Sequence, residues 1–152
     1  MITKTLIAFL TSWIITNTEF SKEVDPPAFF KLSKKQMSDK ACYSSENCRV
    51  KAYYVKKEGI FFRDNLLPND NICDLSIILH EMVHHYQKNS NRTFDLDERT
   101  LWTLQERQAL YYQNLFLISQ KRLNNNKGPE NILQCEGGSY LDLQYKYKET
   151  NQ

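Results

Sequence analysis

The amino-acid sequence predicts a small α+β domain in which a β-hairpin packs on two amphipathic helices. Between residues 49 and 64, β-branched and aromatic residues alternate along two short runs that are separated by a turn ending at Gly59, which is typical of a hairpin. Segments 71–87 and 96–119 instead carry apolar residues at helical spacing. Because an isolated hairpin is barely stable in water, we expect it to pack against the helices that follow it.

The composition is that of one ordinary folded domain. The chain has 152 residues, of which 41% are hydrophobic and 12% aromatic, and 20 Lys+Arg against 18 Asp+Glu leave a net charge of +2. These values exclude a long disordered, collagen-like or coiled-coil chain. They also argue against a nucleic-acid partner, because no basic patch with interleaved aromatic residues stands out.

Residues 1–18 have the pattern of an export signal peptide. Lys4 precedes a ten-residue apolar stretch from Leu6 to Ile15, and Thr16-Asn17-Thr18 offers small residues for cleavage. Ten apolar residues are too few to span a bilayer, which needs about 20. We therefore predict a secreted or periplasmic protein with no stable membrane span after removal of the signal. The alternatives are a buried N-terminal helix and an uncleaved anchor.

The four cysteines fit an oxidising compartment, where an even number in a small domain usually forms disulfides. Cys42 and Cys48 flank a short, turn-rich segment and are predicted to pair, which leaves Cys73 to bond with Cys135. Loop closure predicts that the short bridge contributes about 2 kcal/mol to stability and the long one about 4 kcal/mol. The alternative is a structural zinc site, which the lack of a Cys-x-x-Cys pair disfavours.

Beyond the signal, the chain divides into a lead-in and one domain. Residues 19–41 mix charges with Pro26-Pro27 and are predicted to be loosely ordered, apart from a short helix near 32–37 that Ser33 would cap. Residues 42–152 form the domain. Its first long helix is predicted to begin with Asn71 or Asp74 as N-cap and to end near residue 87.

The three histidines of the chain all lie in the first long helix, within His80-Glu81-Met82-Val83-His84-His85. In a helix, His80 and His84 differ by about 40° around the axis and about 6 Å along it, so both can bind one Zn²⁺. Glu81 can then act as the general base that takes a proton from metal-activated water. His85 is the alternative to His84 as ligand, but it lies about 140° from His80.

A catalytic zinc site needs a third protein ligand, and no histidine follows His85. Glu106 lies inside the second helix on one face with Ala109, whose small side chain would let the two helices approach closely. Glu98 is the alternative ligand. Acidic residues are, however, expected at a helix start because they favour the positive end of its dipole.

These residues resemble a family of small exported bacterial zinc metallopeptidases of the gluzincin type. The resemblance covers about residues 42–118 and rests on two blocks, 76–87 (SIILHEMVHHYQ) and 106–113 (ERQALYYQ), and more loosely on Cys48 followed by 50–54. It implies a zincin-like fold, with Glu106 as the third ligand and Gln113 in a supporting polar role. Gln108 departs from the pattern, because the family usually has a second acid there.

The function predicted from these features is exported, zinc-dependent hydrolysis of peptide bonds in a peptide or protein substrate. A histidine or tyrosine donor often stabilises the oxyanion, and His85, Tyr111 and Tyr112 are available for that role. The hairpin offers an edge to which an extended peptide can add. The alternative function is an exported, disulfide-bonded binding or inhibitory domain in which zinc is structural or absent.

Overall fold

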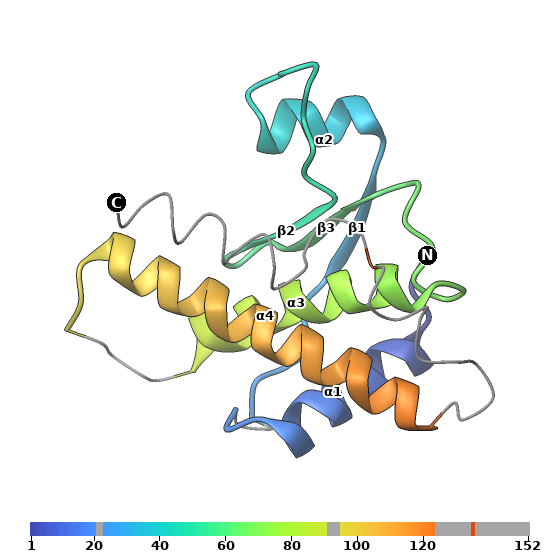
Figure 1. The fold of residues 1–152 in the computed structure, drawn as a ribbon. Coiled ribbons are helices and arrows are strands. Elements are labelled where there is room, and N and C mark those ends of the chain that lie inside the picture. The colour runs from blue at the N-terminus through green and yellow to red at the C-terminus, as the bar shows by residue number, and fades with distance from the viewer. Residues whose placement is uncertain (21–22, 91–94, 124–134, 136–152) are drawn as a thin grey trace.

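The fold is a small three-stranded mixed sheet with helices on both of its faces (Figure 1). The computed structural model describes residues 1–20, 23–90, 95–123 and 135. Its elements are α1 (Lys4–Asn17), β1 (Phe29–Leu32), α2 (Lys34–Ala41), β2 (Ala52–Val55), β3 (Gly59–Arg63), α3 (Ile72–Asn89) and α4 (Glu98–Leu123). This architecture confirms the predicted α+β class.

The predicted hairpin is formed by β2 and β3, which pair antiparallel with Tyr53 opposite Phe61. The turn residue Lys57 and Gly59 both have positive φ, 71° and 134°. At Gly59 a Cβ atom would lie 2.4 Å from the backbone oxygen of Ala28, so only glycine allows β1 to approach β3 here.

The sheet separates two hydrophobic clusters, because successive residues of a strand point to opposite faces. Phe61 of β3 packs with Met37 of α2 on one face. Ile60 and Phe62 point to the other face, into the larger core formed with α3, α4 and α1. Figure 1 shows this layering, with α2 above the sheet, α3 directly below it, and α4 and α1 beyond α3.

Side-chain caps fix the starts of both long helices. Asn71 is the N-cap of α3, where its side-chain oxygen accepts hydrogen bonds from the backbone N–H groups of Cys73 and Asp74. Asp97 accepts from the backbone N–H and hydroxyl of Thr100 at the start of α4. Both helices therefore begin within about two residues of where the sequence places them.

The lead-in is more ordered than the sequence predicts. Ser33 caps α2 as expected, in a reciprocal capping box with Gln36. Strand β1, in contrast, is not predicted from the sequence. It pairs parallel with β3, with Phe30 beside Phe61. Such a pairing depends on a partner about thirty residues away and leaves no local turn signal.

Helix α1 packs into the larger core. Leu10 and Ile14 are fully buried, and the Trp13 indole donates a hydrogen bond to Ser119 Oγ in α4 at 3.1 Å. The ring of Trp13 also meets Phe116 edge to face. This packing is that of the buried N-terminal helix, the alternative to a signal peptide, and cleavage after residue 18 stays a prediction. Among the described helices, none has both the length and the apolar character needed to cross a bilayer.

Both predicted disulfides are present. Cys42 and Cys48 form a bridge just beyond α2, and Cys73, in the first turn of α3, bonds with Cys135. The second bridge attaches a residue of the C-terminal region to the helix that carries the histidines.

A Leu10→Ala substitution tests the packing of α1. Because the Leu10 side chain is fully buried, we expect the free energy of unfolding to fall by about 2–5 kcal/mol. The measurement is denaturant unfolding of protein whose intact mass shows that residues 1–18 are retained. Thr16→Ala, on the exposed side of the same helix, is the control and should change stability by less than about 0.5 kcal/mol. Equal stability of Leu10→Ala and the parent chain would contradict this packing.

Candidate metal centre

His80, His84 and Glu106 bring one ligand atom each to a common point between α3 and α4. The two histidine Nε2 atoms are 3.1 Å apart. Glu106 Oε1 lies 3.0 Å from His84 Nε2, and its Oε2 lies 3.5 Å from His80 Nε2. Ligand atoms about 2.0–2.1 Å from a tetrahedral zinc ion are about 3.3 Å from one another. The observed spacing therefore fits a single zinc ion.

Close packing of α3 and α4 places Glu106 opposite the histidines. Ala109, about one turn after Glu106 on the same side of α4, is fully buried, and its small side chain lets the two helix backbones approach. Of the two predicted alternatives for the third ligand, the structure brings Glu106 to the histidines. Glu98 lies exposed in the first turn of α4, two turns away.

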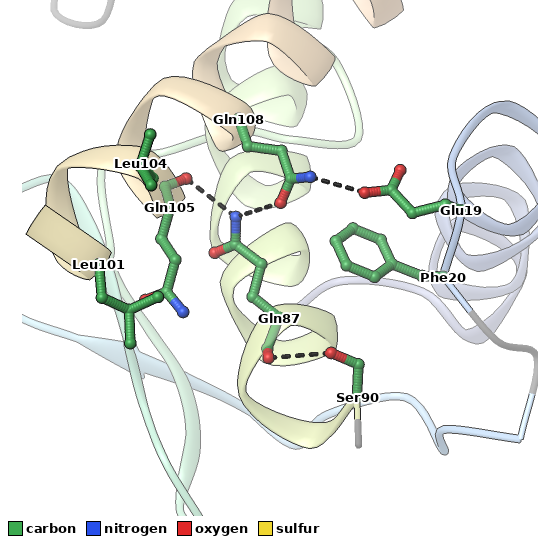
Figure 2. A pocket seen from close by; sticks show the side chains of 8 residues that line it. All are labelled: Glu19, Phe20, Gln87, Ser90, Leu101, Leu104, Gln105 and Gln108. Atoms are coloured by element: carbon green, nitrogen blue, oxygen red, sulfur yellow. Dashed lines mark hydrogen bonds between the residues drawn. The ribbon is translucent and has the colours of Figure 1, made fainter. Parts of the chain in front are cut away.

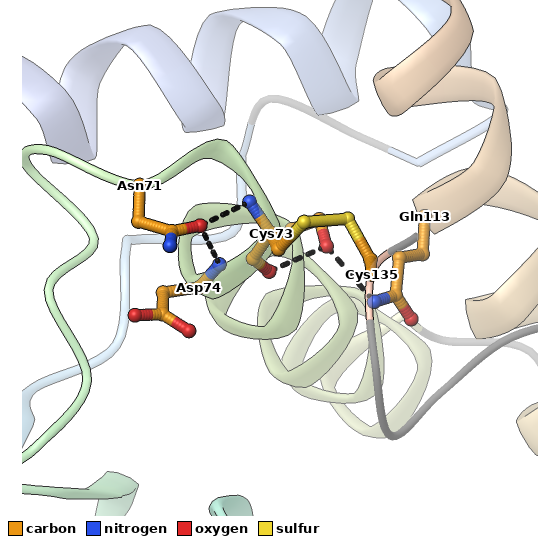
Figure 3. The surroundings of a disulfide bond; sticks show 6 residues. Asn71, Cys73, Asp74, Gln113 and Cys135 are labelled. Carbon is orange, nitrogen blue, oxygen red and sulfur yellow. Dashed lines mark hydrogen bonds between the residues drawn. A yellow bond between two sulfur atoms is a disulfide. The ribbon is translucent and has the colours of Figure 1, made fainter. Parts of the chain in front are cut away.

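Gln113 supports His80 at one end of a chain of hydrogen bonds, and the other end of that chain lies beside the Cys73–Cys135 disulfide (Figure 3). Ser76 Oγ donates to the carbonyl oxygen of Cys73 at 2.7 Å and accepts from Gln113 Nε2 at 3.0 Å. The carbonyl end of Gln113 therefore faces His80 Nδ1, at 3.2 Å. Since a carbonyl only accepts, Nδ1 donates this hydrogen bond, and Nε2 is the nitrogen left for a metal. The chain ends at the Cys73–Cys135 disulfide.

Gln87 supports His84 in the same way, and the sequence analysis did not identify this residue. Its Oε1 lies 2.8 Å from His84 Nδ1, so this imidazole also donates from Nδ1 and leaves Nε2 for the metal. The signal that could have found it is the spacing, because residues three apart in a helix are neighbours on its surface.

Glu81 lies beside this group without belonging to it. Its side chain is buried, and its carboxylate accepts a backbone hydrogen bond from Tyr54 in β2. Burial raises the pKa of Glu81, and the nearby His80 and His84 offset only part of that rise. The carboxylate thus remains separate from the three converging ligand atoms.

The charges of the ligand group depend on one another. Burial disfavours the charged form of Glu106, but hydrogen bonds from His80 and His84 outweigh it and hold the pKa of Glu106 well below its usual range. Burial likewise disfavours protonated His84, yet the hydrogen bond to Glu106 and the charge of Glu81 raise its pKa. The group therefore attracts a positive charge, either a proton or a metal ion.

The predicted oxyanion donors do not face the ligand group. Tyr111 is largely exposed and lies about 140° from Glu106 around α4. The hydroxyl of Tyr112 donates to the carboxylate of Glu19. His85 points away from the other two histidines, and its Nε2 lies 2.7 Å from the backbone oxygen of Asp25. The structure therefore assigns none of the three to the oxyanion.

One known family matches the chain. A family model described as a domain of unknown function (DUF6647) covers residues 2–124, a range that includes every described helix and strand and all the candidate ligands. No curated protein and no solved structure gives a match.

A Glu106→Gln substitution tests the third ligand. We expect its affinity for Zn²⁺, measured by competition with a chromogenic chelator, to fall by more than about 100-fold. Loss of a partner outside the ligand sphere alone costs about 10–100-fold. Glu98→Gln removes the same charge from the same helix and should change affinity by less than about twofold. Full zinc affinity in Glu106→Gln would refute this ligand assignment.

Proposed function

The chain belongs to the DUF6647 family, whose function is not established, and we propose that it is a zinc-dependent metallopeptidase. The observation that carries the proposal is the convergence of His80 Nε2, His84 Nε2 and a Glu106 carboxylate oxygen within 4.8 Å of one another. Glu81, which follows His80 in the sequence, stays outside that group. Glu81 is thus available as a general base in addition to the three ligands.

The donor set suits a catalytic rather than a structural zinc ion. Structural sites usually have four protein ligands, whereas catalytic sites have three and leave one position open. Among the described residues, no fourth histidine, cysteine, aspartate or glutamate joins the group, and all four cysteines are in disulfides. When bound, zinc would polarise a substrate carbonyl and acidify water. This argues against a structural zinc in a mere binding domain.

Glu81 would move the proton during hydrolysis. Its carboxylate lies next to both histidine ligands and is held from the other side by the backbone N–H of Tyr54. In this position it can accept the proton of the attacking water and then pass it to the nitrogen of the departing amine. Glu81 alone would therefore carry the proton from the attacking water to the departing amine.

Strand β2 supports a peptide as the substrate. It is an edge strand of the sheet, and the hydrogen bond from Arg63 N to Lys51 O shows which of its residues point inward to β3. Because these directions alternate, the backbone groups of Ala52 and Tyr54 point away from β3, to the outer edge of the sheet. Glu81 binds there to Tyr54, so a peptide added along this edge would pass close to the base.

A secreted or periplasmic location belongs to the same proposal. Two disulfides in a small domain are typical of proteins that fold in an oxidising compartment. The apolar segment at the N-terminus supports export independently of the disulfides.

A Glu81→Gln substitution tests the reaction. We expect the variant to bind Zn²⁺ as tightly as the parent chain within a few-fold, because the three ligands are unchanged. Its kcat for a peptide cleaved by the parent chain should fall by about 10²–10⁴-fold. Cleavage of a mixed peptide library followed by mass spectrometry identifies that peptide.

Two results would contradict the proposal. If the parent chain binds zinc and cleaves no member of the library, a disulfide-bonded binding or inhibitory domain becomes the better explanation. If Glu81→Gln cleaves as fast as the parent chain, the general base lies elsewhere.

A further inference from the structure

We propose that Gln87 is a positioning residue of the metal centre, which orients His84 and holds α4 in place beside Glu106. The inference rests on the proposed zinc site and names a residue outside its ligand set. Three hydrogen bonds of one buried amide carry it. Gln87 Oε1 lies 2.8 Å from His84 Nδ1, while Nε2 donates to the backbone oxygen of Gln105 at 2.9 Å and to Gln108 Oε1 at 2.8 Å.

The partners of Gln87 leave its amide only one orientation. A backbone carbonyl can only accept, so the nitrogen end of Gln87 must face Gln105 in α4. The oxygen end then faces His84, which must donate from Nδ1. This leaves Nε2, 3.0 Å from Glu106 Oε1, as the nitrogen at which a metal ion would replace the proton shared with that carboxylate. Gln87 thereby sets the ring direction and keeps Nδ1 protonated, as a zinc ligand bound through Nε2 requires.

The side-chain amide of Gln108, which accepts the hydrogen bond from Gln87, also has only one possible orientation (Figure 2). Gln108 Nε2 donates to a carboxylate oxygen of Glu19 at 2.7 Å, and its Oε1 accepts from Gln87. The other carboxylate oxygen of Glu19 accepts the hydroxyl of Tyr112. All the hydrogen bonds from His84 to Glu19 therefore donate in one direction and end on a negative charge.

This direction explains why position 108 holds an amide. Gln108 accepts from Gln87 at one end and donates to Glu19 at the other, and a carboxylate cannot donate. An acid at position 108 would meet the Glu19 carboxylate as a like charge. Where the family that this chain resembles usually has an acid at this position, this chain has Gln108, and the carboxylate is supplied instead by Glu19, just after α1.

Gln87 also acts on the third ligand. Its bond to Gln105 ties α3 to α4 at the residue that immediately precedes Glu106. The loss of this bond would loosen the carboxylate and the imidazole together. Because Gln87 is 8% exposed, its bonds are shielded from water. Glu19 is exposed, so its contribution is screened and should be smaller.

The test compares three glutamine variants of the full chain. Gln87→Met preserves the approximate volume and removes the amide, and Gln108→Met removes the acceptor and donor that orient it. Gln105→Met is the matched control. It changes a side chain that lines the same pocket as Gln87 and Gln108 (Figure 2), and it keeps the backbone carbonyl that Gln87 binds. We measure Zn²⁺ affinity by chelator competition, and the hydrogen-bonded Nδ1–H signal of His84 in metal-free protein by ¹H–¹⁵N NMR.

We expect zinc affinity to fall by about 10–100-fold in Gln87→Met, as for other partners of metal-bound histidines. In Gln108→Met the loss should be smaller, and Gln105→Met should match the parent chain. The parent chain should show the hydrogen-bonded Nδ1–H signal of His84, and Gln87→Met should lose it. A residue that serves stability alone would lower the unfolding temperature of the metal-free protein without changing this signal.

Unchanged zinc affinity and an unchanged Nδ1–H signal of His84 in Gln87→Met would overturn the inference. If that variant does not fold, the same result in Gln108→Met overturns it. A parent chain that binds no zinc would remove the proposed function instead, while the Nδ1–H signal of metal-free His84 still tests the role of Gln87.

Discussion

The rest of the site depends on the contact between α3 and α4, which holds two imidazole nitrogens and a carboxylate 3.0–3.5 Å apart. Partly buried polar atoms this close are costly unless a positive charge is shared among them. The raised pKa of His84 expresses that demand for a positive charge, and the lowered pKa of Glu106 shows that its carboxylate stays negatively charged beside the histidines. A metal ion meets the same demand, and its presence would replace the proton.

Two glutamines, one from each helix, bridge α3 and α4 and each binds one of the two histidine ligands. Gln113 of α4 holds His80 of α3, and Gln87 of α3 holds His84 and bonds back to α4. Each histidine ligand is thus fixed by a glutamine that also joins the two helices, so helix packing and the orientation of the histidines are coupled. Amides are neutral acceptors, which leaves the negative charge of the site on Glu106 and Glu81. That charge distribution favours a cation at the ligands and a base beside them.

The remaining elements support this helix pair from three sides. The sheet supplies the backbone group that holds Glu81, and the Cys73 bridge anchors the start of α3. Helix α1 fills the core with Leu10, Trp13 and Ile14, and the residue that follows α1 and its C-cap, Glu19, ends the hydrogen bonds from His84. An apolar N-terminal segment that has the composition of an export signal therefore also forms a core helix, since both require the same hydrophobic residues.

The sequence by itself determined what lies within one element. The helical period placed His80 and His84 on one face, a cap residue marked the start of α3, acidic residues marked the start of α4, and the cysteine count and spacing implied both disulfides. The tertiary structure alone decided what passes between elements. It selected Glu106 over Glu98, paired β1 with β3, placed the candidate oxyanion donors Tyr111 and Tyr112 away from the ligand group and brought Glu19 to Gln108. The physical reason is that backbone geometry fixes angles along a helix or strand, whereas the approach of separate elements depends on the packing of the whole core.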